Sequence, residues 1–319
     1  MIRDRVRTAI LLGGGVREAI MAQPVLRAVP GATILAGPEA VGTLVGLPDM
    51  GRRLILDGSP GSWLRAFRRL REGSISRVVL TPPVTVGAAA LAYFAGVPHR
   101  LMLEGPFDLT ATDRIRRVRG LHPVDASHRL AAAAGSGDPP AEPGDAPSLT
   151  PTNAVRQRAA ERWPDVSGRH GAYLVVVPGH GSWSGRPPAR LWGAERFAVV
   201  ANQSTADRIL LLAGQGDAGA VRETRAGIAK PTIVVRLVDV TIEEVAAIGE
   251  RSLAVIGHDS DALHVAAAAG APVLALLGPQ GTAPRGPRVT SQRVDDFERL
   301  LAGQVVAELR RHLRVTSYA

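Results

Sequence analysis

Residues 255–279, VIGHDSDALHVAAAAGAPVLALLGP, contain two apolar runs separated by a polar turn and an alanine-rich helical segment. The first run ends at His258 and Asp259. Ser260 or Asp261 is a natural N-cap, because its side-chain oxygen can accept a backbone N–H from the first helical turn. Strand, turn, helix and strand predict a βαβ unit with parallel strands. The positive end of the helix is also suited to a phosphate, although for so short a pattern a simply capped helix is the more economical interpretation.

The same alternation of apolar runs and helical spacing extends along most of the chain. It is interrupted at 135–153 by a segment rich in Gly, Pro, Ser and Asp, which predicts an interdomain linker or loop. The predicted strands are 8–13, 32–37, 53–56, 76–81, 172–179, 207–214, 232–239, 252–259 and 271–279. The predicted helices between them are 18–29, 38–47, 62–73, 194–203, 219–229, 241–250 and 262–270. The pattern predicts an α/β fold of two Rossmann-like halves, with ligands beyond the carboxyl ends of the strands.

We expect three parts. Residues 1–150 form an N-terminal Rossmann-like domain, residues 151–295 form a C-terminal one, and residues 296–319 contain a closing helix. The apolar residues of 295–315 recur at helical spacing. By analogy with other two-domain proteins of this kind, we expect this helix to pack back on the N-terminal domain.

The composition excludes several classes of protein. The 319 residues are 45% hydrophobic, which is enough for two cores. There is no cysteine, which excludes a disulfide scaffold, a cysteine nucleophile and a thiolate metal site. No apolar run is long enough for a transmembrane helix, and the N-terminal run is too short for a signal peptide. We therefore expect a soluble, cytoplasmic protein.

The chain is strongly basic, with a formal net charge of +9 at pH 7. Lys230 is its only lysine, so the charge comes almost entirely from arginine. The arginines are spread along the chain apart from the clusters at 65–72 and 113–120, which we interpret as solvated helix faces. We expect no nucleic-acid partner. At most, the arginines attract an anionic acceptor or give peripheral association with a membrane.

Several motifs together carry a family resemblance. Segment 255–279 resembles the nucleotide-binding signature of the glycosyltransferase family 9 heptosyltransferases, which has an Asp-Ser/Thr-Gly turn, a His four residues after the Ser/Thr, an alanine-rich helix and a Gly-x-Pro strand ending in Gly-Pro. Segment 175–201 resembles the family's PG…K-x-W-P-x-E-x-F stretch, with an arginine in place of the usual lysine. The matching positions there are Arg190, Trp192, Glu195 and Phe197. Segments 210–223 and 236–252 also match the family, and segment 91–102 resembles its A-G-V-P-x-R strand turn. The similarity is strong in the C-terminal half and weak in the N-terminal half.

The resemblance implies a GT-B fold, in which two Rossmann-like domains face each other across a cleft. It implies a glycosyltransferase whose C-terminal domain binds a nucleotide-sugar donor, typically ADP-heptose, and whose N-terminal domain binds the acceptor. It further implies an inverting transfer without a metal or another cofactor. The charge of the diphosphate is then balanced by helix N-termini and by a cation such as Arg190.

The donor site implied by the resemblance includes serine hydroxyls, two apolar residues at a strand end that line an adenine pocket, and a histidine within reach of a phosphate or sugar oxygen. The candidate donor-binding residues are Ser182, Ser184, Arg190, Gly216, Leu237, Val238, Asp259, Ser260, Asp261 and His264. The chain departs from the family at Asp261, where the family has glycine. A carboxylate there repels a diphosphate unless it points away.

The N-terminal stretch LLGGGVREAIMAQP, residues 11–24, corresponds to the family's G-D-x-x-x-x-x-P loop. Aligned on Pro24, Arg17 stands at the glycine and Glu18 at the aspartate that is the proposed general base. The resemblance therefore implies that Glu18 accepts the acceptor's proton, with Gly14, Gly15 and Arg17 near the acceptor. The alternative is that Glu18 is a first-turn helix residue favoured by the helix dipole.

The leading hypothesis is a glycosyltransferase that moves a heptose-type sugar from an ADP-sugar to a hydroxyl of a glycan, envelope or natural-product acceptor. One alternative is a degenerate, non-catalytic sugar-nucleotide-binding or scaffold protein. Another is a GT-B enzyme that uses a UDP-sugar. A dinucleotide oxidoreductase is disfavoured, because the glycine loop at 13–15 lacks the G-x-G-x-x-G pattern. The acceptor and the oligomeric state are not specified by the sequence.

Overall fold

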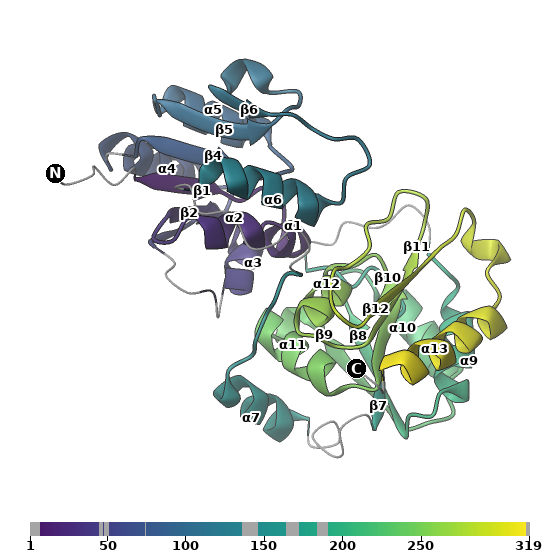
Figure 1. Ribbon diagram of the computed structural model, residues 1–319. Coiled ribbons are helices and arrows are strands. Elements are labelled where there is room, and N and C mark those ends of the chain that lie inside the picture. The colour runs from purple at the N-terminus through teal and green to yellow at the C-terminus, as the bar shows by residue number, and fades with distance from the viewer. Residues whose placement is uncertain are drawn as a thin grey trace. The chain divides into compact units, whose positions relative to one another are not determined.

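The computed structural model describes residues 7–44, 47, 51–73, 75–135, 146–163, 172–183 and 191–316. The chain divides into two compact units, Met1–Pro147 (unit 1) and Ser148–Ala319 (unit 2), so that the boundary falls within the segment 135–153 (Figure 1).

Unit 1 contains a six-stranded sheet of order β3-β2-β1-β4-β5-β6, and all of its strand pairs are parallel. The strands are β1 (Thr8–Leu11), β2 (Thr33–Ala36), β3 (Arg53–Ile55), β4 (Arg77–Leu80), β5 (His99–Leu103) and β6 (Asp113–Ile115). The helices are α1 (Val16–Met21), α2 (Gln23–Ala28), α3 (Pro38–Val41), α4 (Pro60–Glu72), α5 (Val86–Phe94) and α6 (Pro123–Ala134), with 3-10 turns η1 (Gly42–Leu44) and η2 (Asp108–Thr110).

Unit 2 repeats this topology. Its sheet has the order β12-β11-β10-β7-β8-β9, which is the same order when its strands are counted from β7. The strands are β7 (Tyr173–Val177), β8 (Arg208–Ala213), β9 (Thr232–Arg236), β10 (Ala254–His258), β11 (Val273–Leu277) and β12 (Val289–Arg293). The helices are α7 (Asn153–Arg162), α9 (Ala194–Gln203), α10 (Ala218–Ala226), α11 (Ile242–Arg251), α12 (Asp261–Ala268) and α13 (Ala302–Thr316), with 3-10 turns η3 (Leu237–Asp239) and η4 (Phe297–Arg299). The prediction of two Rossmann-like α/β units is confirmed.

The central strands of each sheet are buried on both faces because they are apolar on both sides. In unit 1, Ile10 packs with α2 and α6, whereas its neighbours Ala9 and Leu11 pack with α4 and α5 on the opposite face. In unit 2, one face of the sheet packs against α9 and α13. Helices α11 and α12 pack against each other. Burial on both faces explains why these strands form continuous apolar runs in the sequence.

The closing helix α13 packs in unit 2. Its buried residues Val305, Val306 and Leu309 belong to the core of unit 2, where the helix packs against α9. Unit 1 has the same arrangement, since α6 follows its sixth strand and packs against α2. The apolar face of α13 therefore covers the sheet of its own unit, and its expected packing on the N-terminal domain stays a prediction.

Three strands were not predicted. β6 and β12 are short or polar strands at the sheet edges, and β5 begins with His99 and Arg100. The helices of the described residues include none that is both long and apolar enough to cross a membrane.

Candidate functional site

The sheet order of unit 2 brings four predicted loops to one edge. Strands β10, β7, β8 and β9 are adjacent and parallel, so their carboxyl ends deliver the loops that begin at Asp259, Pro178, Gly214 and Leu237 in a row. This edge is where ligands of open parallel sheets bind. The described donor-binding candidates all lie on these loops or at the helix starts that follow them.

Asp217 joins the β7 loop to the β8 loop. Its carboxylate is buried and accepts three backbone hydrogen bonds: Oδ1 from the His180 amide at 2.7 Å, and Oδ2 from the amides of Gly181 at 2.9 Å and Gly214 at 2.7 Å. The loops pack so closely that a Cβ on Gly214 would lie 2.6 Å from the backbone nitrogen of Ser182. Asp217 was not among the predicted residues. Its position after Gly-x-Gly at the start of a helix was the available signal.

The carboxylate of Asp261 points to the β7 loop. The Ser182 hydroxyl donates to Asp261 Oδ2 at 2.5 Å, and both side chains are buried. Nearby amides of α12 are also bonded within the protein: Ala262 N–H donates to the Gly181 carbonyl, and Leu263 N–H donates to the hydroxyl of the N-cap Ser260. The family's glycine position is thus occupied by a side chain that ties α12 to the β7 loop.

Asp259 and His264 form a second pair at this helix. His264 is buried, and its Nε2 lies 3.2 Å from Asp259 Oδ1, while Asp259 Oδ2 accepts the Thr282 amide at 2.9 Å. We expected the His264 ring to reach toward a phosphate or sugar. The structure instead engages Nε2 with Asp259, so that the pair fixes the loop after β11.

His258 at the end of β10 is a buried packing residue. The Trp192 amide donates to its Nε2 at 2.7 Å, so the proton of the neutral ring is on Nδ1, which lies 3.3 Å from the Gly179 carbonyl. Phe197 and Phe297 contact the ring edge-on. Burial lowers the pKa of His258 to about 4. Trp192 and Phe197, two residues of the family motif, therefore act here as core residues that hold the β7 loop.

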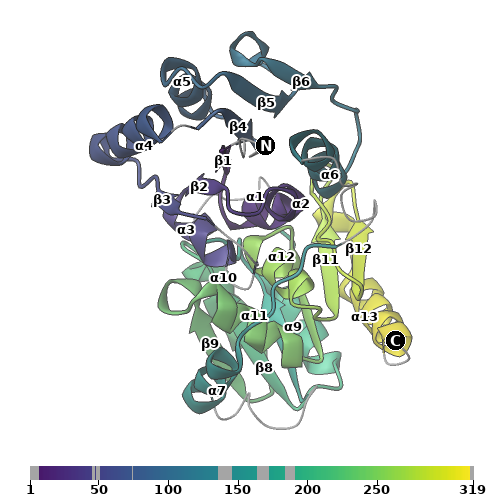
Figure 2. The same cartoon turned by 60° about the vertical axis from the view of Figure 1, so that its left-hand side comes forward.

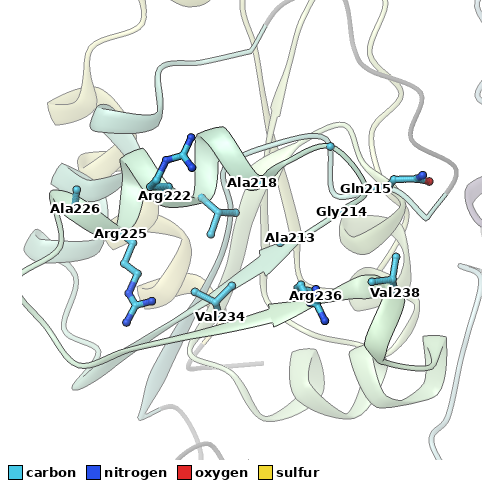
Figure 3. Close-up of a pocket in the computed structure, with 12 residues that line it drawn as sticks. Ala213, Gly214, Gln215, Ala218, Arg222, Arg225, Ala226, Val234, Arg236 and Val238 are labelled. Atoms are coloured by element: carbon cyan, nitrogen blue, oxygen red, sulfur yellow. The ribbon is translucent and has the colours of Figure 1, made fainter.

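A cavity of about 770 Å³ lies beside the carboxyl ends of β8 and β9, along α10, and its size is typical of small-molecule sites (Figure 3). It brings together the candidates Gly216 and Val238. It adds three cations that were not predicted: Arg222 and Arg225 from α10, and Arg236 from β9. Its lining residues are Ala213, Gly214, Gln215, Gly216, Ala218, Val221, Arg222, Arg225, Ala226, Val234, Arg236 and Val238. None of these lining residues is acidic, so the cavity combines apolar walls with positive charge.

Other predicted donor residues are distributed differently. Leu237, the first residue of η3, is fully buried, whereas Val238, which is largely exposed, lines the cavity. Ser184 and Arg190 lie outside the described residues. Within the described residues, no group of three or more His, Asp and Glu side chains has an arrangement suited to a metal ion.

In unit 1, the glycine turn after β1 presents Glu18. Gly14 has a positive φ of 73°, and a Cβ on Gly13 would lie 2.1 Å from the Pro83 carbonyl oxygen, so both positions require glycine. Glu18 Oε2 accepts the Gly15 amide at 3.0 Å, and Oε1 accepts two hydrogen bonds from Arg17, at 3.0 and 2.7 Å.

The environment of Glu18 favours its charged form. Burial alone would raise its pKa, but the charge and hydrogen bonds of Arg17, with the Gly15 amide, lower the pKa below its ordinary value. The structure therefore brings Arg17, Glu18 and Gly15 together as one hydrogen-bonded group at the start of α1. The hydrogen bond from the Gly15 amide also places Glu18 as a first-turn residue of α1, so the geometry agrees with the alternative interpretation as well.

The family model for glycosyltransferase family 9 (heptosyltransferase) matches residues 63–298. The chain belongs to glycosyltransferase family 9. Solved structures agree on the fold. A family 9 glycosyltransferase from Veillonella parvula has a TM-score of 0.81 at 18% identity, covering 98% of each chain. ADP-heptose LPS heptosyltransferase II of E. coli has a TM-score of 0.78 at 20% identity, covering 98% of this chain and all of that one.

A third structure, an E. coli heptosyltransferase with ADP, has a TM-score of 0.74 at 15% identity, covering 96% of this chain and 99% of the other. No curated protein matches the chain. The predicted membership of family 9, the GT-B fold class and the assignment as a glycosyltransferase are confirmed.

Replacing Asp217 by Asn is expected to destabilise unit 2 by about 1–3 kcal/mol, because the amide places an NH₂ group against a backbone N–H that now donates to a carboxylate. Urea unfolding followed by circular dichroism measures the loss. Asp239→Asn, at an exposed carboxylate on the next loop, is the matched control. Equal unfolding midpoints for the two variants would contradict the role assigned to Asp217.

His258 makes the stability of unit 2 depend on pH. Its folded-state pKa is about 4 and the unfolded value is about 6.5, so the unfolded chain binds more protons between these values. Stability is therefore lost as the pH falls from about 6.5 toward 4, by up to roughly 3 kcal/mol. Unfolding curves at several pH values should show a shallower pH slope for His258→Gln than for wild type. His99→Gln, at an exposed ring in unit 1, should keep the wild-type slope.

Proposed function

We propose that the chain is an inverting, metal-independent glycosyltransferase that moves a heptose-type sugar from an ADP-sugar to an acceptor hydroxyl. The observation that carries the proposal is the family match over residues 63–298, which includes the whole donor edge of unit 2. Two related solved structures hold ADP and ADP-2-deoxy-2-fluoro heptose, which supports an adenine nucleotide as the donor's leaving group. Glycans, envelope components and natural products are the acceptor classes we retain.

The donor nucleotide is assigned to the carboxyl edge of unit 2. Gly216 and Val238 lie in a cavity whose apolar wall suits a base and whose arginines suit phosphate. Arg236 is ion-paired at 2.7 Å with Asp239, which lies outside the cavity lining, whereas Arg222 and Arg225 form no ion pair with the described residues. In a transfer without a metal ion, arginines are the groups that balance the diphosphate charge.

The proposed chemistry uses Glu18 as the general base. The acceptor oxygen attacks the anomeric carbon from the side opposite the diphosphate, the bond from that carbon to the phosphate oxygen breaks, and ADP leaves with the electron pair. The acceptor's proton passes to the Glu18 carboxylate. The lowered pKa of Glu18 supports its being ionised at neutral pH, and its partial exposure supports access by an acceptor. Arg17, Gly14 and Gly15 are the proposed acceptor contacts.

One observation favours a second candidate function. The buried Asp261 carboxylate holds Ser182, so a diphosphate at α12 would meet a negative charge and a hydroxyl that is already bonded. This arrangement supports a non-catalytic sugar-nucleotide-binding protein, in which a nucleotide binds without turnover. A UDP-sugar donor is distinguished from an ADP-sugar by the base alone.

Titration calorimetry with ADP, UDP and GDP tests the donor assignment, and ADP is expected to bind most tightly. Asp261→Asn is expected to tighten ADP binding about tenfold, because it removes the negative charge at the start of α12 and keeps an acceptor for Ser182. Asp207→Asn, the same charge change at the opposite end of β8, should leave the affinity unchanged. Weaker ADP binding by Asp261→Asn would show that this carboxylate does not oppose the diphosphate.

Glu18→Gln tests the catalytic step. The amide is nearly isosteric but cannot accept a proton, so kcat should fall by roughly 10²–10⁴-fold while the affinity of unit 2 for ADP stays at the wild-type value. Turnover is followed as ADP release from ADP-heptose with a heptose-accepting glycan. Glu39→Gln, at a neighbouring first-turn carboxylate, is the control. Wild-type kcat in Glu18→Gln would remove Glu18 from catalysis, and absence of turnover in the wild type, with ADP bound, would favour the non-catalytic alternative.

A further inference from the structure

Helix α5 of unit 1 is apolar on both faces. Its sequence, VGAAALAYF, contains no charged residue, and one face packs into the core through Ala89, Leu91 and Ala92. The other face is open: Val86 is 69% exposed and Phe94 is 72% exposed. A helix that is apolar all round is normally covered on every side.

The repeated topology shows what a covered version of this helix looks like. Helix α12 occupies the same place in unit 2, between the fourth and fifth strands, and all eight of its residues are buried. Helix α11 packs beside it, and the chain at Leu149 crosses it, with the Leu149 amide donating to the Ala268 carbonyl at 2.8 Å. In unit 1, α4 lies beside α5 (Figure 2). Among the described residues, Val86, Tyr93 and Phe94 on the outer face of α5 are at least half exposed.

The exposed face of α5 continues onto its neighbours. Leu109 in η2, which contacts α5, is 99% exposed, and Leu64 on α4 is about half exposed. Arg100 holds η2 against the helix, because its Nε donates to the Thr110 carbonyl while its guanidinium lies 5.5 Å from the ring centre of Tyr93. We call Leu64, Val86, Tyr93, Phe94 and Leu109 the α5 surface.

Positive charge surrounds the α5 surface. Between residues 60 and 120 the chain has ten arginines and four acidic residues, so this part of unit 1 is strongly cationic. Arg65, Arg68 and Arg71 are exposed on α4, on one side of α5. On the other side, the exposed arginines of β6 and the following residues are Arg114, Arg116, Arg117 and Arg119. Against a second copy of the chain, two such surfaces would repel each other.

We propose that the α5 surface binds the face of an anionic lipid bilayer. Exposed leucine, valine and aromatic side chains insert at the level of the headgroups, and the flanking arginines contact anionic lipids. Neither contribution suffices alone, since a few apolar side chains or a few charges give only weak, reversible binding. The inference goes beyond the proposed function and does not depend on it, because it concerns unit 1 and no residue assigned to the transfer.

Vesicle flotation with the full chain tests the proposal. The wild type should float with phosphatidylcholine vesicles that contain phosphatidylglycerol, should remain unbound with phosphatidylcholine alone, and should be released by added salt. Phe94→Ser with Leu109→Ser should lower the partition coefficient about tenfold or more, because the two largest exposed anchors are lost. Arg68→Gln with Arg71→Gln should lower it on anionic vesicles by a similar factor.

Two control variants in unit 2 test whether the loss of flotation is specific to the α5 surface. Leu301→Ser removes an exposed leucine and Arg299→Gln an exposed arginine, and both should float like the wild type. Circular dichroism melts and ADP calorimetry of every variant should match the wild type, which shows that the fold and the donor site are retained. Absence of flotation in the wild type, equal flotation in all variants, or a dimer in light scattering that Phe94→Ser with Leu109→Ser dissociates would each overturn the proposal.

Discussion

A single buried carboxylate, that of Asp217, organises the carboxyl edge of the sheet in unit 2. Asp217 accepts three backbone amides from two loops, and a buried carboxylate is tolerated only when such donors compensate its charge. The two loops cannot separate without leaving that charge unpaired. The positions of Ser182 beside α12 and of the cavity beside α10 both depend on this fixed β7–β8 junction. His258 holds the β7 loop from the β10 side, because its ring bonds both the Trp192 amide and the Gly179 carbonyl.

The departure of this chain from its family is local and electrostatic. At the position of the family's glycine, Asp261 has a carboxylate that accepts a hydrogen bond from the Ser182 hydroxyl. Under the proposed function, the side chain that stabilises the β7–α12 junction would also oppose an approaching diphosphate. The arginines of the neighbouring cavity act in the opposite direction. In the proposed donor site, one buried carboxylate is thus set against the guanidinium groups of α10 and β9.

The fold could be predicted because its strands are buried on both faces and thus continuously apolar, as in the TAIL segment of β1 and the YLVVV segment of β7. Edge strands such as β12, with the sequence VTSQR, lack that signal, because solvent covers one side. The site was predicted less completely. Ser182, Gly216 and Val238, named from the resemblance, lie as expected on loops at the carboxyl ends of adjacent strands. The direction of the Asp261 side chain depends on a contact between loops 79 residues apart, and the pairing of His264 depends on its burial in the folded unit. Arg222 and Arg225 carry no sequence signal for a site, because the cavity that they line exists only once β9 lies beside β8.

At both candidate sites, backbone amides at the helix start are already hydrogen-bonded within the protein. In unit 1 the Gly15 amide is bonded to Glu18, and in unit 2 the amides of Ala262 and Leu263 are bonded to Gly181 and Ser260. A ligand at either helix start must exchange one hydrogen bond for another, and such exchanges contribute little net free energy. Binding energy must then come mainly from apolar contact and from charge. In a chain whose cations are almost all arginine, the planar guanidinium groups provide that charge in the form best suited to phosphate.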